Sequence, residues 1–366
     1  MSKFIILCGG TGGHLAPGLA VGQALIDAGD EASFVISRKA VDSRLVGKYS
    51  DLRIIKAPGT AFSLRPARLF RFLSELAESV KFGRKTISEG GYDAVISFGG
   101  FNSLGFSIAA MTLGVPLILH EANRRAGKAT RLLGRFAERI YVPHGVKIPR
   151  RKGGQVRYSG YPVRGEIKKL PAAESKGKFG FGTDGKLLLV LGGSQGALAL
   201  NEWAARNFGR LAEAGMDVLC VCGPGKNSFA GETVRTKNFG ERKIEFLEFC
   251  DDMASAMSAA DLAVARAGAG TIAELARCRL PSVIVPYPFA ADNHQRENAR
   301  CFEKQGGCAV VEQSDMSRLF DEVSCLINNP ALLGAMRENL ARVDALNDTS
   351  KIIEDLRLVA GGAGEK

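Results

Sequence analysis

The strongest constraint on the fold is a pattern that the chain contains twice: a short apolar run, a glycine-rich loop and a helix-like stretch. The first copy is ILCGGTGGHLAPGLAVGQAL at residues 6–25, and the second is LVLGGSQGALALN at residues 189–201. A buried strand that turns through glycines into a helix is typical of doubly wound α/β domains. The repetition therefore predicts two such domains.

Further apolar runs extend both copies. They occupy residues 31–37, 53–57, 93–97, 116–120 and 139–143 in the first half, and residues 217–223, 244–249, 262–268, 281–287 and 308–312 in the second. Helix-like stretches follow them, beginning with residues 14–28. Parallel strands need crossover connections and are buried on both faces, so the pattern predicts two parallel sheets covered by helices.

The chain length of 366 residues also fits two domains better than one. We expect a first domain at 1–160 and a second at 161–347, with the linker near 158–162. A helical stretch at 348–361 is expected to pack back on the first domain. Two such domains in tandem make a cleft, and strand ends and loops are where ligands should bind.

The net charge of +11 is unevenly distributed, because residues 124–157 contain eleven Lys or Arg and a single acidic residue, Glu138. A cationic surface attracts nucleic acid, an anionic membrane or phosphorylated substrates, and charge alone does not choose among them. A solubilising face is the plain alternative. Aromatic residues are sparse in this stretch, so we do not expect nucleic acid as a partner.

Two other features bound the class of protein. No run approaches the ~18 apolar residues that span a bilayer, and no signal-peptide pattern follows Lys3, so we expect the chain to stay in the cytoplasm. The eight cysteines never form a CxxC pair, and most lie in apolar runs. We expect them to pack as small hydrophobic side chains.

Both glycine-rich loops are candidate phosphate sites, because glycines admit a phosphate close to the backbone and a helix start favours an anion. Neither loop is followed by GK[ST], and Leu15 occupies the third glycine position of a GxGxxG pattern. ATP hydrolysis and nicotinamide binding are therefore disfavoured. For either loop alone, a tight turn that only packs strand on helix is the plain alternative.

Seven segments in order resemble motifs of the MurG family of peptidoglycan glycosyltransferases. They are GGTGGH (9–14), HEAN (120–123), GYPVR (160–164), GGSQGALALN (192–201), FCDDM (249–253), RAGAGTIAE (266–274) and DNHQRENA (292–299). The resemblance implies the GT-B fold, with two doubly wound Rossmann-like domains whose parallel sheets face a cleft. It also implies inverting transfer of GlcNAc from UDP-GlcNAc to the C4 hydroxyl of the muramyl sugar of lipid I.

The resemblance assigns the acceptor to the first domain. It implies that His14 is the general base, and an imidazole can accept a hydroxyl proton at neutral pH. A histidine at a helix start is otherwise a common structural residue, and Glu121 is the rival base. Thr11, Gly12, Gly13 and Asn123 are expected to line the same site.

The donor is assigned to the second domain. Arg164, Ser194, Gln195 and Gly196 are expected to hold the diphosphate. Glu274 is expected on the ribose hydroxyls, and Ala269 is expected to bind substrate. Phe249, Cys250 and Met253 are expected to border the uracil, and His294 and Gln295 the donor sugar. Two positions depart from the family: Ala267 replaces a common serine, and Cys250 a commoner isoleucine.

No cofactor and no metal are expected, because no DxD-type pair stands out in the motifs. Asp251 and Asp252 are interpreted as the start of a helix, where carboxylates suit the helix dipole. The resemblance implies UDP-GlcNAc, lipid I, an anionic membrane surface and proteins of cell-wall synthesis and division as partners. It places the enzyme peripherally on the cytoplasmic face of the inner membrane.

The segment 60–85 is expected to dock on that membrane. It mixes Leu64, Leu69, Phe70, Phe72 and Leu73 with Arg65, Arg68, Arg71, Lys81, Arg84 and Lys85. An apolar stripe flanked by cations suits an anionic leaflet, and an ordinary amphipathic core helix is the alternative.

Three other functions stay open at this point. A diacylglycerol glucosyltransferase would share the fold and the UDP site. A non-catalytic nucleotide-binding scaffold would bind UDP without turnover. A nucleic-acid-binding protein would lose affinity steeply with salt.

Overall fold

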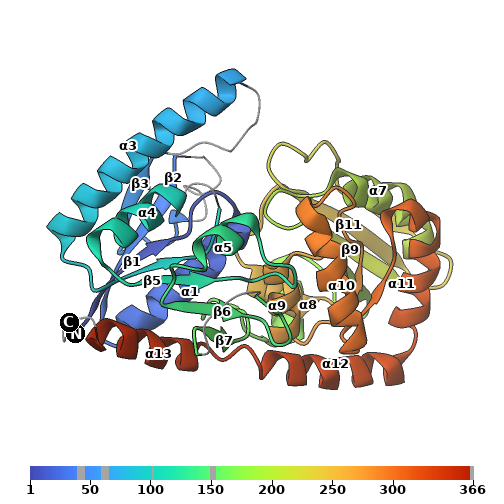
Figure 1. Ribbon diagram of the computed structural model, residues 1–366. Helices are drawn as coiled ribbons and strands as arrows, with labels where there is room; N and C mark the ends of the chain where they lie inside the picture. Colours follow the sequence, from blue (N-terminus) through green and yellow to red (C-terminus); the bar gives the residue numbers. More distant parts are fainter. Residues whose placement is uncertain (39–45, 59–65, 101–102, 149–153, 363–366) are drawn as a thin grey trace. The chain divides into compact units, whose positions relative to one another are not determined.

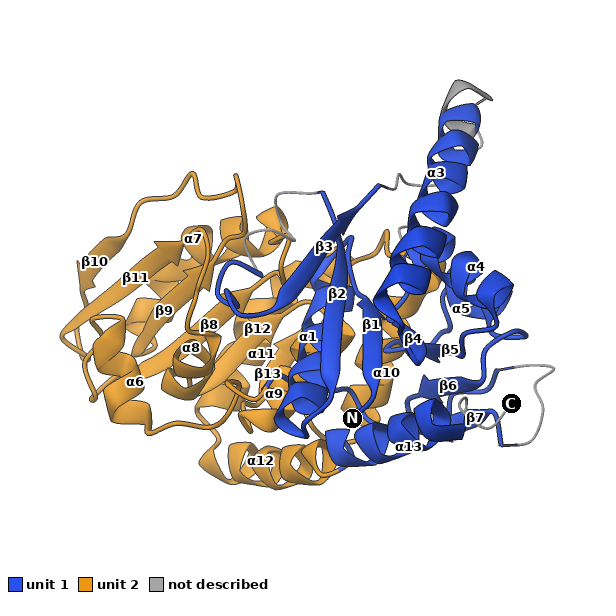
Figure 2. Cartoon of the chain, turned by 90° about the vertical axis from the view of Figure 1, so that its left-hand side faces the viewer, with its two compact units in different colours: residues 1–164, 346–366 blue, residues 165–345 orange. Residues whose placement is uncertain are grey.

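The computed structural model describes residues 1–38, 46–58, 66–100, 103–148 and 154–362. The chain divides into two compact units. Unit 1 comprises Met1–Arg164 and Leu346–Lys366, and unit 2 comprises Gly165–Ala345 (Figure 2). Each unit is built on its own seven-stranded sheet.

Unit 1 is a parallel α/β unit (Figure 1). Its strands run in the order β3-β2-β1-β4-β5-β6-β7, and all neighbours pair in parallel. The predicted doubly wound sheet is confirmed. Its elements are β1 (Lys3–Leu7), α1 (Gly12–Asp27), β2 (Glu31–Ser37), β3 (Arg53–Ala57), α3 (Pro66–Gly90), β4 (Ala94–Ser97), α4 (Leu104–Leu113), β5 (Leu117–His120), α5 (Lys128–Leu133), β6 (Arg139–Val142), β7 (Val156–Tyr158) and α13 (Thr349–Gly362).

The alternation of side chains along the strands explains why both faces of this sheet are covered. In β1, Phe4 and Ile6 belong to one core, and Ile5 and Leu7 belong to another. The first core includes buried side chains of α1 and α13, and the second includes those of α3 and α4. Successive side chains of a strand point to opposite faces, so each face needs its own layer of helices.

Helix α13, the last in the chain, is fixed to unit 1 by polar contacts as well as by its apolar face. Its Asp355 accepts a hydrogen bond from Tyr141 Oη at 2.8 Å and pairs with Arg139 at 3.4 Å. Arg357 pairs with Asp30 at 2.7 Å. These contacts join the end of the chain to the loop before β2 and to β6, far away in sequence.

Unit 2 repeats the architecture. The strand order is β10-β11-β9-β8-β12-β13-β14, with every pair parallel except the antiparallel pair of β10 and β11. Its elements are α6 (Ala172–Lys178), β8 (Lys186–Leu191), α7 (Leu198–Glu213), β9 (Met216–Val221), β10 (Glu232–Arg235), β11 (Glu241–Leu247), α8 (Met253–Ala259), β12 (Leu262–Ala265), α9 (Ala269–Arg277), β13 (Ser282–Ile284), η2 (Ala291–Asn293), α10 (His294–Lys304), β14 (Cys308–Val310), η3 (Gln313–Arg318), α11 (Leu319–Ile327) and α12 (Pro330–Asp344).

In both units the loops that follow the parallel strands come together at the carboxyl edge of the sheet, where such folds bind ligands. The glycine loops predicted at 9–13 and 192–197 follow β1 and β8 at this edge. Within the described ranges, no helix combines the length and apolar composition that crossing a membrane requires.

Candidate active site

His14 lies in the first turn of α1, at the carboxyl edge of the unit 1 sheet. Its Nδ1 atom is 3.1 Å from Thr11 Oγ1. Thr11 occupies the N-cap position, and its side chain contacts the imidazole instead of capping the helix. When Nδ1 carries the proton and donates it to this hydroxyl, Nε2 is the basic nitrogen.

The loop after β4 passes directly alongside this imidazole. Gly99 and Gly100 have φ values of +97° and +84°. A Cβ on Gly99 would lie 3.5 Å from His14 Nε2, and one on Gly100 would lie 3.3 Å from Nδ1. These glycines let the backbone touch the ring and so limit its movement. Sequence reasoning missed both residues, although a glycine pair directly after an apolar run was a usable signal.

Glu121 follows β5 at the same edge, and it is buried. Its Oε1 accepts hydrogen bonds from the backbone and side-chain nitrogens of Asn123, at 3.0 and 3.1 Å. Its Oε2 accepts from Gly127 N at 2.7 Å and Thr130 Oγ1 at 3.0 Å. Both oxygens are therefore engaged in holding the loop between β5 and α5.

His120, beside Glu121, is a buried ring with a different environment. It lies against Phe98, with ring centroids 5.1 Å apart, and meets Tyr161 edge-on at 6.4 Å. Burial lowers the pKa of His120 to about 4, and the adjacent Gly160 backbone offsets only part of this effect. The ring is neutral at pH 7 and packs as an aromatic side chain.

The GYPVR motif is held where the chain re-enters unit 1. Tyr161 N donates to Asn347 Oδ1 at 2.8 Å. A Cβ on Gly160 would lie 2.1 Å from the carbonyl oxygen of Leu346, so only glycine fits there. Arg164 ends this motif and is the last residue of the first segment of unit 1.

The glycine loop of unit 2 joins β8 to α7 through a tight turn. Gly193 and Gly196 have φ values of +76° and +65°, and Gly196 N donates to Gly193 O at 2.9 Å. Ser194 and Gln195 form the tip of this turn. Among the described residues, the amides of Ser194 and Gln195 have no hydrogen-bond acceptor in the protein. The tip is therefore able to receive an anion.

The loop after β9 packs against this turn by backbone contact. A Cβ on Gly196 would lie 1.8 Å from Cys222 O, and one on Gly223 would lie 2.4 Å from Gly196 Cα. Buried Asn201 of α7 reaches across and donates to Cys222 O at 3.1 Å. The two loops therefore form one interlocked structure.

The amino end of α9 adjoins the glycine loop. Thr271 Oγ1 lies 3.9 Å from a Cβ built on Gly193 and 3.5 Å from one built on Gly268. Ala269 opens the helix, and Glu274 lies three residues after Thr271, on the same side of α9. Two helix starts and a hydroxyl meet here, an arrangement that favours a diphosphate. Sequence reasoning missed Thr271.

The loop before α8 and Met253, the first residue of that helix, carry the side chains predicted to border uracil. Phe249 and Met253 are partly buried and Cys250 is buried. Asp252 caps α8 by accepting a hydrogen bond from Ser255 N at 2.9 Å, which confirms its interpretation as a helix start. Lys178 and Ser255 lower the pKa of Asp252 to about 2, outweighing the effect of burial.

His294 and Gln295 open α10, after a strained connection. Asp292 and Asn293 both have positive φ values, of 52° and 55°, which non-glycine residues rarely adopt. His294 Nδ1 lies 2.7 Å from Ala291 O, and Gln295 Oε1 accepts from Tyr287 N at 2.9 Å. Strain of this kind is concentrated at binding sites.

Apart from Arg164, which ends the GYPVR motif in unit 1, the predicted site residues fall into two groups. Thr11, Gly12, Gly13, His14, Glu121 and Asn123 lie at the carboxyl edge of unit 1. Ser194, Gln195, Gly196, Phe249, Cys250, Met253, Ala269, Glu274, His294 and Gln295 lie on the loops and helix starts at the corresponding edge of unit 2. Within the described residues no cluster of three metal-binding side chains is found.

Comparisons with known proteins define the class. Residues 4–142 match the model of the glycosyltransferase family 28 N-terminal domain, and residues 187–356 that of the C-terminal domain. The crystal structure of Acinetobacter baumannii MurG is similar, with a TM-score of 0.68 at 24% identity, over 98% of this chain and 99% of that chain. The fold is that of a GT-B glycosyltransferase.

Two relatives narrow this class. A protein of Opitutus terrae is 47% identical over 97% of this chain and 94% of its own length, and one of Sorangium cellulosum is 34% identical over 97% and 88%. Both are named UDP-N-acetylglucosamine–N-acetylmuramyl-(pentapeptide) pyrophosphoryl-undecaprenol N-acetylglucosamine transferase. The chain belongs to the MurG family within glycosyltransferase family 28.

Proposed function

We propose that this chain transfers GlcNAc from UDP-GlcNAc to lipid I, the undecaprenyl-linked muramyl pentapeptide, in peptidoglycan synthesis. The observation that carries the proposal is the 47% identity to the Opitutus terrae transferase along nearly the whole of both chains. The positions of the motif residues at the carboxyl edges of the two sheets support it.

Unit 2 is the donor side in this proposal. The tip of the Gly193–Gly196 turn and the start of α9 receive the diphosphate through amide N–H groups and the Thr271 hydroxyl. Arg164, which belongs to unit 1, is assigned to the phosphates by the motif resemblance alone. Glu274 accepts hydrogen bonds from the ribose, Phe249, Cys250 and Met253 border the uracil, and His294 and Gln295 contact the sugar.

Unit 1 supplies the base. The C4 hydroxyl oxygen of the muramyl sugar attacks C1 of GlcNAc, the bond from C1 to the UDP oxygen breaks, and the hydroxyl proton passes to His14 Nε2. UDP leaves with the electron pair, and configuration at C1 inverts. His14 is favoured over Glu121, because both Glu121 oxygens already accept two hydrogen bonds each.

One assay tests the reaction. The purified protein is incubated with UDP-GlcNAc and a short-chain lipid I analogue, and disaccharide product and UDP are quantified. We expect both in equal amounts. Product formed instead from UDP-glucose and diacylglycerol would identify a different lipid glycosyltransferase, and UDP binding without turnover would identify a nucleotide-binding scaffold.

The same proposal places the enzyme at an anionic membrane through helix α3. Phe70 and Leu73 are 77% and 53% exposed, and Arg71 is exposed between them. The amino-terminal turns of α3 extend beyond the rest of unit 1 (Figure 2). Helices of a parallel sheet start at its carboxyl edge, so this end of α3 lies at the same edge as His14.

The predicted docking stripe is corrected at one residue. Phe72 is only 6% exposed and packs in the core that α3 shares with α4, so it is not available to a membrane. Leu64 and Arg65 lie outside the described residues, as do the side chains of Arg68 and Leu69.

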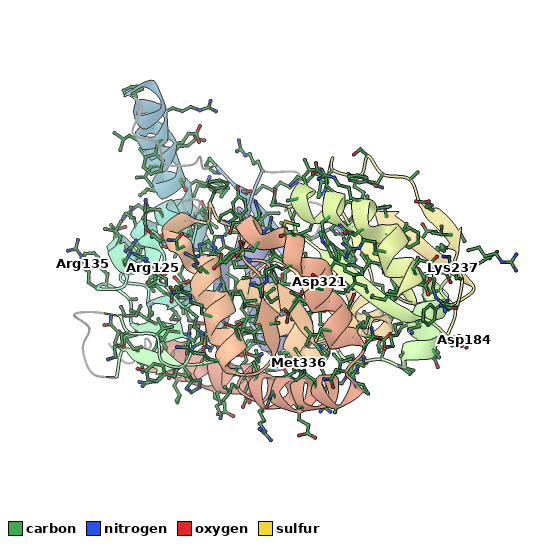
Figure 3. All side chains as sticks on the ribbon, turned by 90° about the vertical axis from the view of Figure 1, so that its right-hand side faces the viewer. Arg125, Arg135, Asp184, Lys237, Asp321 and Met336 are labelled. Atoms are coloured by element: carbon green, nitrogen blue, oxygen red, sulfur yellow. The ribbon has the colours of Figure 1, made fainter. Side chains whose placement is uncertain are left out.

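A second cationic surface lies on α5 and the residues after it. Lys128, Arg131 and Arg135 are exposed on and after α5, beside Phe136, which is 55% exposed. Figure 3 shows Arg125 and Arg135 at the surface of unit 1. Arg139 and Arg157, by contrast, pair with Asp355 and belong to the attachment of α13. Arg150, Arg151 and Lys152 lie outside the described residues.

The double substitution Phe70→Ser and Leu73→Ser should weaken binding to phosphatidylglycerol vesicles by about 10-fold or more, because two apolar side chains no longer enter the interface. Vesicle cosedimentation measures this. Leu358→Ser is the matched control, since Leu358 is 73% exposed on α13. Equal binding by the double variant and the control would overturn the placement of the membrane at α3.

A further inference from the structure

Lys226 is a cation that the motif comparison does not assign, and it contacts the glycine loop directly. It lies in a turn after β9, where Lys226 N donates to Gly223 O at 3.1 Å. Its Nζ donates to Gln195 O at 2.6 Å and to Gly196 O at 3.1 Å. One ammonium therefore binds two successive carbonyl oxygens of the candidate diphosphate loop.

These two contacts fix the direction of the last two amides of the loop, those of Gly196 and Ala197. In a trans peptide the C=O and N–H bonds point in opposite directions. Because the carbonyl of Gln195 faces Lys226, the N–H of Gly196 points away from it, toward Gly193 O. The carbonyl of Gly196 faces Lys226 too, so the N–H of Ala197 at the start of α7 also points away.

Lys226 is itself held in place by the interlocked loops. Asn201 Nδ2 lies 3.5 Å from the Lys226 carbonyl and 3.1 Å from that of Cys222. Gly223 packs against Gly196 without a side chain between them. The backbone that carries the Lys226 side chain is therefore fixed against the loop that its ammonium contacts. The ammonium also places a positive charge behind amides that face an anion.

We propose that Lys226 is a positioning residue for the donor diphosphate: it holds the carbonyls of Gln195 and Gly196 on one side, which keeps the Gly193–Gly196 turn closed and presents the N–H of Ala197 to the phosphates on the other side. The proposal rests on the proposed function, since it takes the ligand of this loop to be a nucleoside diphosphate. Lys226 acts through the loop backbone, and the phosphates contact the amides.

The test compares the dissociation constants of UDP and uridine by calorimetry for wild type, Lys226→Met and Lys226→Arg. We expect Lys226→Met to weaken UDP binding about 10- to 100-fold, the range for loss of charged hydrogen bonds. Uridine binding should stay within about twofold of wild type. Lys226→Arg, which keeps the charge, should recover part of the UDP affinity. Lys237→Met is the control, because Lys237 extends from the surface of unit 2 (Figure 3).

Unchanged UDP binding in Lys226→Met, or an equal loss for UDP and uridine, would overturn the positioning role. An arginine variant no better than the methionine variant would also overturn it. Transfer to the lipid I analogue is measured separately with wild type. Absence of transfer there, with intact and Lys226-dependent UDP binding, would count against the proposed function alone.

Discussion

His14→Ala is expected to lower kcat for GlcNAc transfer by about 10²- to 10⁴-fold, the contribution typical of a positioned general base. The affinity for UDP should change little, because His14 lies in unit 1 and the candidate nucleotide residues other than Arg164 lie in unit 2. Initial rates with the lipid I analogue and calorimetry with UDP measure the two effects. Near wild-type turnover would remove the assignment.

Glu121→Gln is compared with His14→Ala, because Glu121 is the rival candidate for the general base. An amide nitrogen would face one pair of the donors that Glu121 now accepts, either those of Asn123 or those of Gly127 and Thr130. This variant should lower the melting temperature and keep the shape of the pH–rate profile. A profile that loses its acidic limb, the fall in rate as the base becomes protonated, in Glu121→Gln but keeps it in His14→Ala would reverse the two roles.

The sequence predicts the sheets well because their strands are buried on both faces and therefore read as continuous apolar runs. The sequence does not predict strands that lack a continuous apolar run. β10 is the polar segment ETVR at the sheet edge, paired antiparallel and mostly exposed, and β7 is only three residues long. Neither gives an apolar signal.

Candidate site residues could be named from the sequence where they belong to a local motif, as for His14 and Glu274. Gly99, Gly100 and Lys226 were not assigned, because their roles come from contacts between loops far apart in sequence. Gly99 follows β4 yet touches a ring on α1, and Lys226 follows β9 yet binds the loop after β8. Strand order creates both contacts.

The difference between local motifs and contacts made in the fold also explains what the sequence could not show about Glu121 and Phe72. The HEAN motif identifies a carboxylate at a strand end, but only the structure shows that four nearby donors already occupy it. Helical spacing identifies an apolar stripe on α3, but which of its residues face α4 depends on tertiary packing. A sequence pattern identifies the type of side chain at a position. The contacts of that side chain in the folded protein determine whether it is available for binding or catalysis.

The packing of the donor loop gives a second prediction with a large effect. Gly196→Ala should destabilise the protein by roughly 3 kcal/mol and weaken UDP binding by more than about 10-fold. The new Cβ would lie 1.8 Å from Cys222 O, and alanine at a φ of +65° is strained in addition. Relief requires the two loops to separate, which moves the amides at the tip of the turn.

Gly225→Ala isolates the steric part of this effect. Gly225 has the same φ of +65° and lies in the loop that packs on Gly196, but a Cβ there meets nothing within 4 Å. It should therefore cost only about 1 kcal/mol and leave UDP affinity nearly unchanged. Urea unfolding and UDP calorimetry on both variants make the comparison. If the two alanines proved equally costly, backbone strain alone would explain them, and the contact between the loops would have no role in forming the diphosphate site.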